Sequence, residues 1–277
     1  MPLYKKVLNA PLTKTSYQQL QKVLLSTQYH NEAHACLAIT ADTLYSGSSL
    51  GIVWTWDLLL EFPRPLTVSD YPITSLVLAP ECFAMDSSGQ VFALGETARP
   101  VVSVRPGGWA RMVRLDDGIL AMPVMENQPS LSLVDPRTGM PVSSWELRGL
   151  VSSVASRNSL VVCGGLEGGV VTIDVRKGPL RLEPGNGMVT ALAFDTEGRL
   201  AHSALNDVII DGSHMFSCDD PVECLCWNGD RLFLGSDNSV LCLNSGKTTA
   251  VRGPRFMVDW AQGVMVGCSD STIHACT

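Results

Sequence analysis

One short stretch of the sequence carries the pattern of a catalytic nucleophile. Residues 47–51, Gly-Ser-Ser-Leu-Gly, match G-x-S-x-G, in which a serine sits on a sharp turn between a strand and a helix. The residues that follow, IVWTWD, are β-branched and aromatic and favour a strand instead of a helix. We therefore interpret this stretch as a hairpin turn, and the sequence predicts no nucleophile at Ser49.

Metal and acid–base chemistry find little support among the nine cysteines and five histidines. Cys224 and Cys226 would share one face of a strand, but no second Cys or His pair completes a zinc site. Most cysteines lie in apolar runs, where a free thiol behaves as a small hydrophobe and a reducing compartment suits it. With no phosphate-binding loop and no catalytic triad, we expect no enzyme activity, no metal and no cofactor.

Arginine and aromatic residues recur just before the apolar segments of the chain. Such side chains are common anchors of protein interfaces, and arginine can hold a carboxylate or phosphate with two parallel hydrogen bonds. We interpret these residues as a candidate peptide-binding surface, the alternative being ordinary surface positions. The candidates are Tyr71, Trp109, Arg111, Arg148, Arg252 and Arg255.

The elements that would position these residues are clearest in residues 150–177. Three short apolar runs, at 150–155, 160–163 and 170–175, are rich in β-branched residues and too short for helices. Arg157-Asn158 and the glycine-rich stretch 164–169 separate them, and both favour turns. With a weaker fourth strand at 180–182, this segment predicts one four-stranded antiparallel sheet.

The same unit recurs along the chain. Its first strands are expected to start near residues 35, 73, 111, 151, 189, 222 and 256, so successive starts lie 33–40 residues apart. One such sheet cannot bury both of its faces alone, and stacking the sheets around an axis does so. The sequence therefore predicts an all-β fold in which residues 1–277 form a single seven-bladed β-propeller, with residues 1–20 as an N-terminal extension.

A propeller places the candidate residues on two opposite rims. The loops that enter each first strand form the top rim, which would carry the arginine and aromatic candidates. Two D-x-R tripeptides, Asp135-Pro136-Arg137 and Asp174-Val175-Arg176, follow third strands and would lie on the bottom rim. The last repeat has no fourth strand before Thr277, so we expect residues 22–26 to complete it and close the ring.

The charge composition bears on which classes of partner the protein can bind. The net charge is −7 and no basic block appears, so we expect no direct nucleic-acid partner and no anionic membrane partner. No apolar run approaches the roughly 18 residues of a transmembrane helix, and the N-terminus lacks the pattern of a signal peptide. These features predict a nuclear or cytoplasmic protein.

Parts of the sequence resemble known propeller families. Trp56-Asp57, at the end of a third strand, is the dipeptide of WD repeats, and His34 resembles the histidine that precedes many of their first strands. Residues 133–178 resemble the central blades of Bub-type spindle-checkpoint propellers and their mRNA-export relative, Rae. The shared features are D-P-R-T at 135–138, the strand 158–164 and the D-x-R at 174–176.

This resemblance implies a non-enzymatic scaffold at the kinetochore. It would be monomeric within a complex and bind a peptide motif of a larger partner, such as a checkpoint kinase-like protein, across the top of the ring. The family also reads phosphothreonine peptides through basic residues, for which Arg181 is the matching cation. Alternatively, Asp135, Arg137, Asp174 and Arg176 resemble the D-x-R of cullin-ligase substrate receptors. A coat, translation-factor or mRNA-export subunit is a further alternative.

Overall fold

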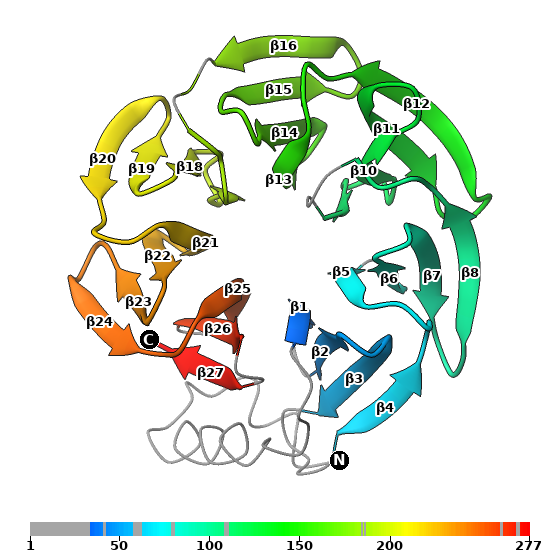
Figure 1. Cartoon of the computed structure of the whole chain (residues 1–277), viewed down its shortest axis with the longest axis horizontal. Helices are drawn as coiled ribbons and strands as arrows, with labels where there is room; N and C mark the ends of the chain where they lie inside the picture. Colours follow the sequence, from blue (N-terminus) through cyan, green and yellow to red (C-terminus); the bar gives the residue numbers. More distant parts are fainter. Residues whose placement is uncertain are drawn as a thin grey trace.

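The short apolar runs form strands, and the breaks rich in glycine, asparagine and aspartate form turns. The computed structural model describes residues 34–40, 43–57, 63–78, 81–107, 111–183, 185, 187–260, 263–269 and 272–277. Within these residues every regular element is a strand, and seven small antiparallel sheets stand around one axis (Figure 1). The predicted seven-bladed β-propeller is confirmed.

Each sheet, or blade, runs from the axis outward in chain order, and blades are numbered here from 1 to 7. The innermost strands are β1 (His34–Ile39), β5 (Ile73–Leu78), β9 (Val113–Arg114), β13 (Val151–Arg157), β17 (Leu192–Phe194), β21 (Val222–Asn228) and β25 (Pro254–Trp260). The second strands are β2 (Thr43–Ser48), β6 (Cys82–Asp86), β10 (Leu120–Met125), β14 (Leu160–Gly165), β18 (Leu200–Ala204), β22 (Arg231–Ser236) and β26 (Gly263–Cys268).

Two further strands complete most blades. The third strands are β3 (Ile52–Asp57), β7 (Gln90–Leu94), β11 (Pro129–Asp135), β15 (Val170–Asp174), β19 (Asp207–Ile210), β23 (Ser239–Cys242) and β27 (Ile273–Cys276). The outer strands are β4 (Arg64–Thr67), β8 (Ala98–Ser103), β12 (Met140–Glu146), β16 (Gly178–Glu183), β20 (Ser213–Ser217) and β24 (Lys247–Ala250). Blade 7 has three strands among the described residues, and the expected closing strand at 22–26 lies outside them.

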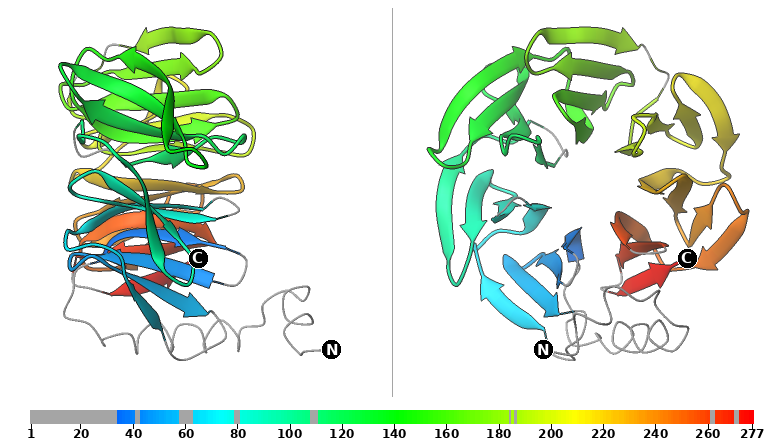
Figure 2. Two further views of the ribbon diagram at one scale, coloured as in Figure 1. Left: turned by 90° about the vertical axis from the view of Figure 1, so that its right-hand side faces the viewer. Right: turned by 180° about the vertical axis from the view of Figure 1, so that it is seen from behind.

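The hydrophobic core is divided among the contacts between blades. In the described residues it forms seven clusters, and each one joins two neighbouring blades. The ring closes through one of them, in which Leu37 and Trp56 of blade 1 pack with Met265 and Ile273 of blade 7. Viewed from the side and from behind, the blades stand next to one another around the axis (Figure 2). Both faces of a sheet are therefore covered by its neighbours, as the apolar second strands require.

Blade 3 departs from the expected pattern. Its innermost strand was expected to start near residue 111, but β9 contains Val113 and Arg114 alone. Pro106 pairs separately with Val124, farther along the same second strand. Val113 pairs with Ala121, so the segment between Pro106 and Val113 contains more residues than the facing segment between Ala121 and Val124. The described residues of blade 3 therefore pair with its second strand at two separate places, Pro106 and Val113–Arg114.

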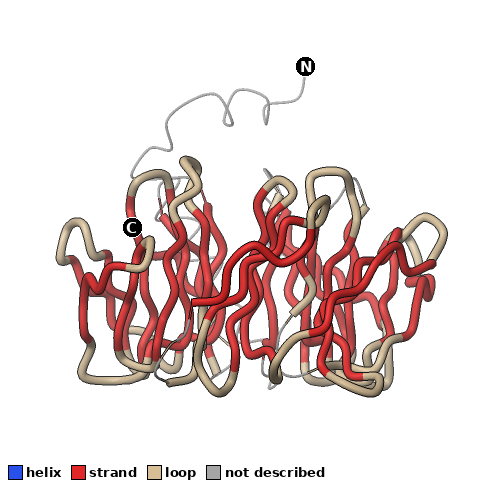
Figure 3. Tube along the Cα trace, turned by 90° about the horizontal axis from the view of Figure 1, so that it is seen from above, coloured by secondary structure: helices blue, strands red, loops and turns tan. Residues whose placement is uncertain are grey.

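Among the described residues, no helix is long and apolar enough to cross a membrane. Connections between strands lie on two opposite faces of the ring, with the strands running between them (Figure 3). The top rim contains the loops that enter the innermost strands and the turns between second and third strands. Backbone hydrogen bonds join the two kinds of connection, for example from the N–H of Ser69 to the carbonyl of Gly51 at 3.1 Å.

Candidate functional site

Three of the six candidate top-rim residues lie on the outer surface of that rim. Tyr71 enters blade 2 and is 55% exposed. Arg148 enters blade 4 and Arg252 enters blade 7, and both are exposed. Asp237, in the second turn of blade 6, accepts a hydrogen bond at 2.7 Å from the N–H of Gly253, which fixes the loop beside Arg252. A rigid framework thus presents these side chains to solvent.

The other described candidates, Arg111 and Arg255, line the central channel together. They border a cavity of about 530 Å³ formed by the innermost strands of blades 4 to 7. Trp109 lies outside the described residues. The remaining lining residues are Ser152, Ser153, Val154, Met188, Thr190, Ala191, Leu192, Glu223, Cys224, Leu225, Phe256 and Met257.

A repeated β-bulge positions the polar residues of this cavity. In blades 1, 2, 4, 6 and 7 the pairing of the first and second strands shifts by one residue near the top of the inner strand. A bulge leaves its extra residue unpaired and re-aims that side chain. The extra residue is Ser152 in blade 4, Glu223 in blade 6 and Arg255 in blade 7. The cavity mouth is therefore built from one backbone device used several times.

In blades 4 and 5 this position carries a hydroxyl that joins neighbouring blades. Ser152 Oγ lies 2.6 Å from the carbonyl oxygen of Val189 in blade 5 and 3.0 Å from that of Gly164. Thr190, the corresponding residue of blade 5, donates a hydrogen bond to the carbonyl of Val222 in blade 6. Small hydroxyls here satisfy backbone groups at the contact between two blades.

In blades 6 and 7 the same position carries opposite charges. Arg255 Nη1 lies 2.8 Å from Glu223 Oε2, so the two bulges are linked by an ion pair. The side chains are 49% and 37% exposed, respectively, which leaves the pair in contact with solvent at the channel mouth. Solvent screening makes such pairs weak stabilisers.

Arg111 reaches across the channel from blade 3 to the opposite side of the ring. Its guanidinium carbon lies 3.8 Å from the centre of the Phe256 ring in blade 7, which is a cation–π contact. Burial lowers the pKa of Arg111 to about 10, which leaves the group charged at neutral pH. Its charge also acts on the thiols of Cys36 in blade 1 and Cys224 in blade 6, although burial still raises the pKa of both to about 12.

The D-x-R residues of the bottom rim stabilise their own turns. Asp135 Oδ1 accepts the backbone N–H of Arg137 at 3.0 Å, and Asp174 Oδ1 accepts that of Arg176 at 2.9 Å. The Arg137 guanidinium also binds Asp135, with Nη2 to Oδ2 at 2.8 Å. Hydrogen bonds from Arg137 hold the pKa of Asp135 below its usual value.

A second cavity of about 530 Å³ lies near the Arg137 turn, between blades 2 and 3. Its cations, Arg99, Arg114 and Arg137, share the lining with three acidic residues, Glu81, Asp116 and Asp117. Arg181, the candidate phosphopeptide contact, lies on the outer strand β16 and pairs with Glu183 at 3.1 Å. These arginines are placed among carboxylates of the same chain.

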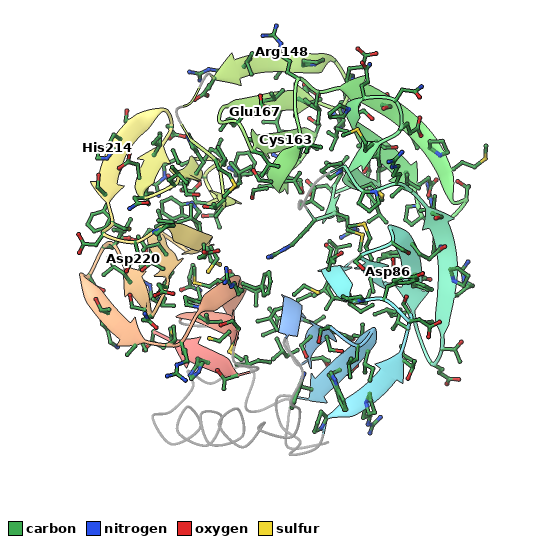
Figure 4. All side chains as sticks on the ribbon, viewed as in Figure 1. Asp86, Arg148, Cys163, Glu167, His214 and Asp220 are labelled. Carbon is green, nitrogen blue, oxygen red and sulfur yellow. The ribbon has the colours of Figure 1, made fainter. Side chains whose placement is uncertain are left out.

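All nine cysteines are free thiols, and eight of them are buried. Cys224 and Cys226 are both buried on β21. Burial is the main cause that raises the pKa of each thiol, which makes the reactive thiolate scarce at neutral pH. Figure 4 shows the side chains on the ring, with Cys163 in blade 4 and Asp86 in blade 2 labelled.

The sequence analysis missed Glu223 and Phe256. Their signal appears once the last repeat is aligned on Pro254, where β25 begins, instead of on the expected start at 256. The residues that follow 73, 151, 189, 222 and 254 then form one column. That column reads Thr74, Ser152, Thr190, Glu223 and Arg255. Two adjacent charges in a column of hydroxyls mark blades 6 and 7 as different, and Phe256 follows directly.

Comparisons with known proteins support the fold. No family model matches the chain, and no curated protein matches it. Among solved structures, a computationally designed protein, Ika8, superposes with a TM-score of 0.67 at 16% sequence identity. The match covers 89% of this chain and 96% of the designed chain. At this identity the likeness shows the propeller architecture alone, so function must be argued from the site.

Proposed function

We propose that this protein is a non-enzymatic scaffold that binds a peptide segment of a larger protein across its top rim. The observation that carries the proposal is the state of the rim arginines. In the described part of the chain, neither Arg148 nor Arg252 forms an ion pair, whereas Arg137 and Arg181 are paired with carboxylates of their own chain. Unpaired, exposed arginines on the same rim as an exposed tyrosine match the composition of interface anchors.

The finer proposal is a Bub-type spindle-checkpoint propeller at the kinetochore, monomeric within its complex. It rests on the residue pattern of 133–178. The pairing of Arg181 with Glu183 favours recognition of an unmodified peptide over a phosphorylated one, because the cation already has a carboxylate partner. A checkpoint kinase-like protein is the partner that this proposal expects, in the nucleus or cytoplasm.

A second candidate is a substrate receptor of a cullin ubiquitin ligase. The observation that favours it is the repeated bottom-rim turn, in which Asp135 and Asp174 hold Arg137 and Arg176 at equivalent places in blades 3 and 4. The two candidates use opposite rims, so substitutions on each rim separate them.

The test compares three tagged forms purified from dividing cells, with mass spectrometry of the associated proteins. The forms are the wild type, a top-rim variant (Tyr71→Ala, Arg148→Ala, Arg252→Ala) and a bottom-rim variant (Arg137→Ala, Arg176→Ala). We expect the top-rim variant to lose partners that the bottom-rim variant keeps. Partners retained by the top-rim variant and lost by the bottom-rim variant would contradict the proposal, and a cullin adaptor among them would establish the second candidate.

A further inference from the structure

The central cavity contains a cation with no anionic partner from the described residues. The cavity is lined by two arginines, Arg111 and Arg255, and by one carboxylate, Glu223. Glu223 is bound to Arg255 at 2.8 Å, and the described residues supply no ion pair to Arg111. The chain as a whole carries a charge of −7, so this local excess of positive charge runs against its overall balance.

The Arg111 guanidinium is held by an aromatic contact, and the described residues supply it with no ion pair. One face stacks on the Phe256 ring at 3.8 Å, and the group is half-buried between blade 3 and the opposite side of the ring. Stacking holds the plane of a guanidinium but uses none of its N–H donors. A charge removed from water without a hydrogen-bonding partner is costly, and an anion that fills this space would offset that cost.

The donor geometry of the guanidinium suits a carboxylate. The cavity has a volume of about 530 Å³ and is bordered by hydroxyl and apolar side chains as well as the two arginines. A planar carboxylate matches the two parallel donors of a guanidinium. The hydroxyls of Ser152 and Thr190 already donate to backbone carbonyls, so Arg111 supplies the main unused donors.

We propose that the top of the central channel is a carboxylate site, in which Arg111 holds an acidic side chain of the peptide bound on the top rim. This inference rests on the proposed function, since the bulge residues that line the cavity stand at the top of the inner strands, next to the loops of that rim. The guanidinium of Arg111 is the recognition group, and the Glu223–Arg255 pair lines the same cavity.

The test uses two probes, a blocked peptide, Ac-Gly-Gly-Glu-Gly-Gly-NH2, and free glutarate. Binding is followed by calorimetry and by the ¹⁵N–¹H signal of the Arg111 side chain, with the glutamine form of the peptide as the uncharged control. We expect both carboxylates to shift the Arg111 signal and the glutamine peptide to bind about 10- to 100-fold more weakly, as the loss of a charge-assisted hydrogen bond implies. Arg111→Gln should abolish the binding, and Arg111→Lys should recover part of it.

Arg64→Gln is the matched control, because it removes an exposed arginine of the outer strand β4, outside the cavity, and should leave glutarate binding unchanged. Equal binding by the wild type and Arg111→Gln, or no shift with either probe, would overturn the inference. Binding of glutarate without binding of the glutamate peptide would overturn the peptide source and identify a free carboxylate as the ligand. Thermal melting of Arg111→Gln shows whether this variant folds. A carboxylate that binds the native state should raise the melting temperature of the wild type and leave that of Arg111→Gln unchanged.

The failures of the two proposals can be told apart. If the top-rim variant keeps every partner while Arg111→Gln still loses glutarate, the rim proposal fails and the carboxylate site stands. If the top-rim variant loses partners that Arg111→Gln retains, and glutarate binds neither the wild type nor Arg111→Gln, the scaffold proposal stands and the channel site fails.

Discussion

Blades 4 and 5 and blades 6 and 7 use the same backbone position for opposite purposes. The bulge residue of blade 4 is a serine whose hydroxyl contacts carbonyls of its own blade and of the next one. The corresponding residues of blades 6 and 7 are Glu223 and Arg255, which bind each other at the channel mouth. The same β-bulge position therefore stabilises the ring in blades 4 and 5 and presents charged side chains in blades 6 and 7. The two sides should therefore differ in how much stability each loses on substitution.

Adding a side chain at the tight contact between blades 4 and 5 should cost the most stability. A Cβ at Gly164 would lie 2.4 Å from a methyl carbon of Val189, so Gly164→Val forces the two blades apart. We expect a loss of about 3 kcal/mol in the free energy of unfolding, the upper range for overpacking, measured by urea denaturation. Gly149→Ala, which has open space around its Cβ, is the control. Equal losses for both would refute a tight contact at Gly164.

Removing the hydroxyl of the same contact should cost less. Ser152→Ala deletes the group that contacts the carbonyls of Gly164 and Val189, and we expect a loss of about 1–2 kcal/mol. Urea denaturation measures it, and Ser153→Ala on the same strand serves as the comparison. An unchanged midpoint for Ser152→Ala would show that the hydroxyl does not stabilise the contact.

Acid should lower the stability of blades 4 and 5, which carry the hydroxyls, because His202 becomes protonated. Burial in blade 5 lowers the pKa of this imidazole below its usual value, and the charge of Glu183 opposes that change. The neutral form is favoured in the folded state, so the stability is fully present above the unfolded pKa and is lost as the pH falls through the folded pKa. Melting temperatures at pH 7.5 and 5.5 should fall more for the wild type than for His202→Gln. A parallel fall in both proteins would contradict this.

The charged pair should matter least for stability. Both side chains are more than a third exposed, so Arg255→Gln or Glu223→Gln should change the free energy of unfolding by at most about 0.5 kcal/mol. The loss should shrink further in high salt, because salt screens exposed charges. A loss as large as that of Ser152→Ala would erase the distinction between the two sides of the ring.

The sequence allowed the blades to be predicted because each depends on local signals. Alternating and β-branched runs such as 160–163, bounded by Gly and Asn turns, locate strands wherever both faces are covered. The bounds of the inner strand of blade 3 were not predicted, since nothing local shows that Pro106 and Val113 pair with the second strand at two separate places. The pairing of Glu223 with Arg255 was also missed, because it joins residues of two blades.

The candidate site was predicted only as a set of residue types. Spacing placed Arg111 and Arg255 before first strands, but only the fold shows that both turn inward while Arg148 and Arg252 stay on the surface. Phe256 became part of the site because Arg111 crosses the whole ring to reach it. Contacts between opposite blades leave no trace in the periodicity of either one.

The division of the core into seven clusters has a consequence for how the sequence can change. Each blade must fit two neighbours and no central template, so a substitution on one side of a contact can be offset by a single change across it. Seven blades can then hold seven different solutions, with one Trp-Asp pair at residues 56–57. A ring of this kind keeps its architecture while the sequences of its repeats diverge from one another. A designed chain at 16% identity can therefore share the fold.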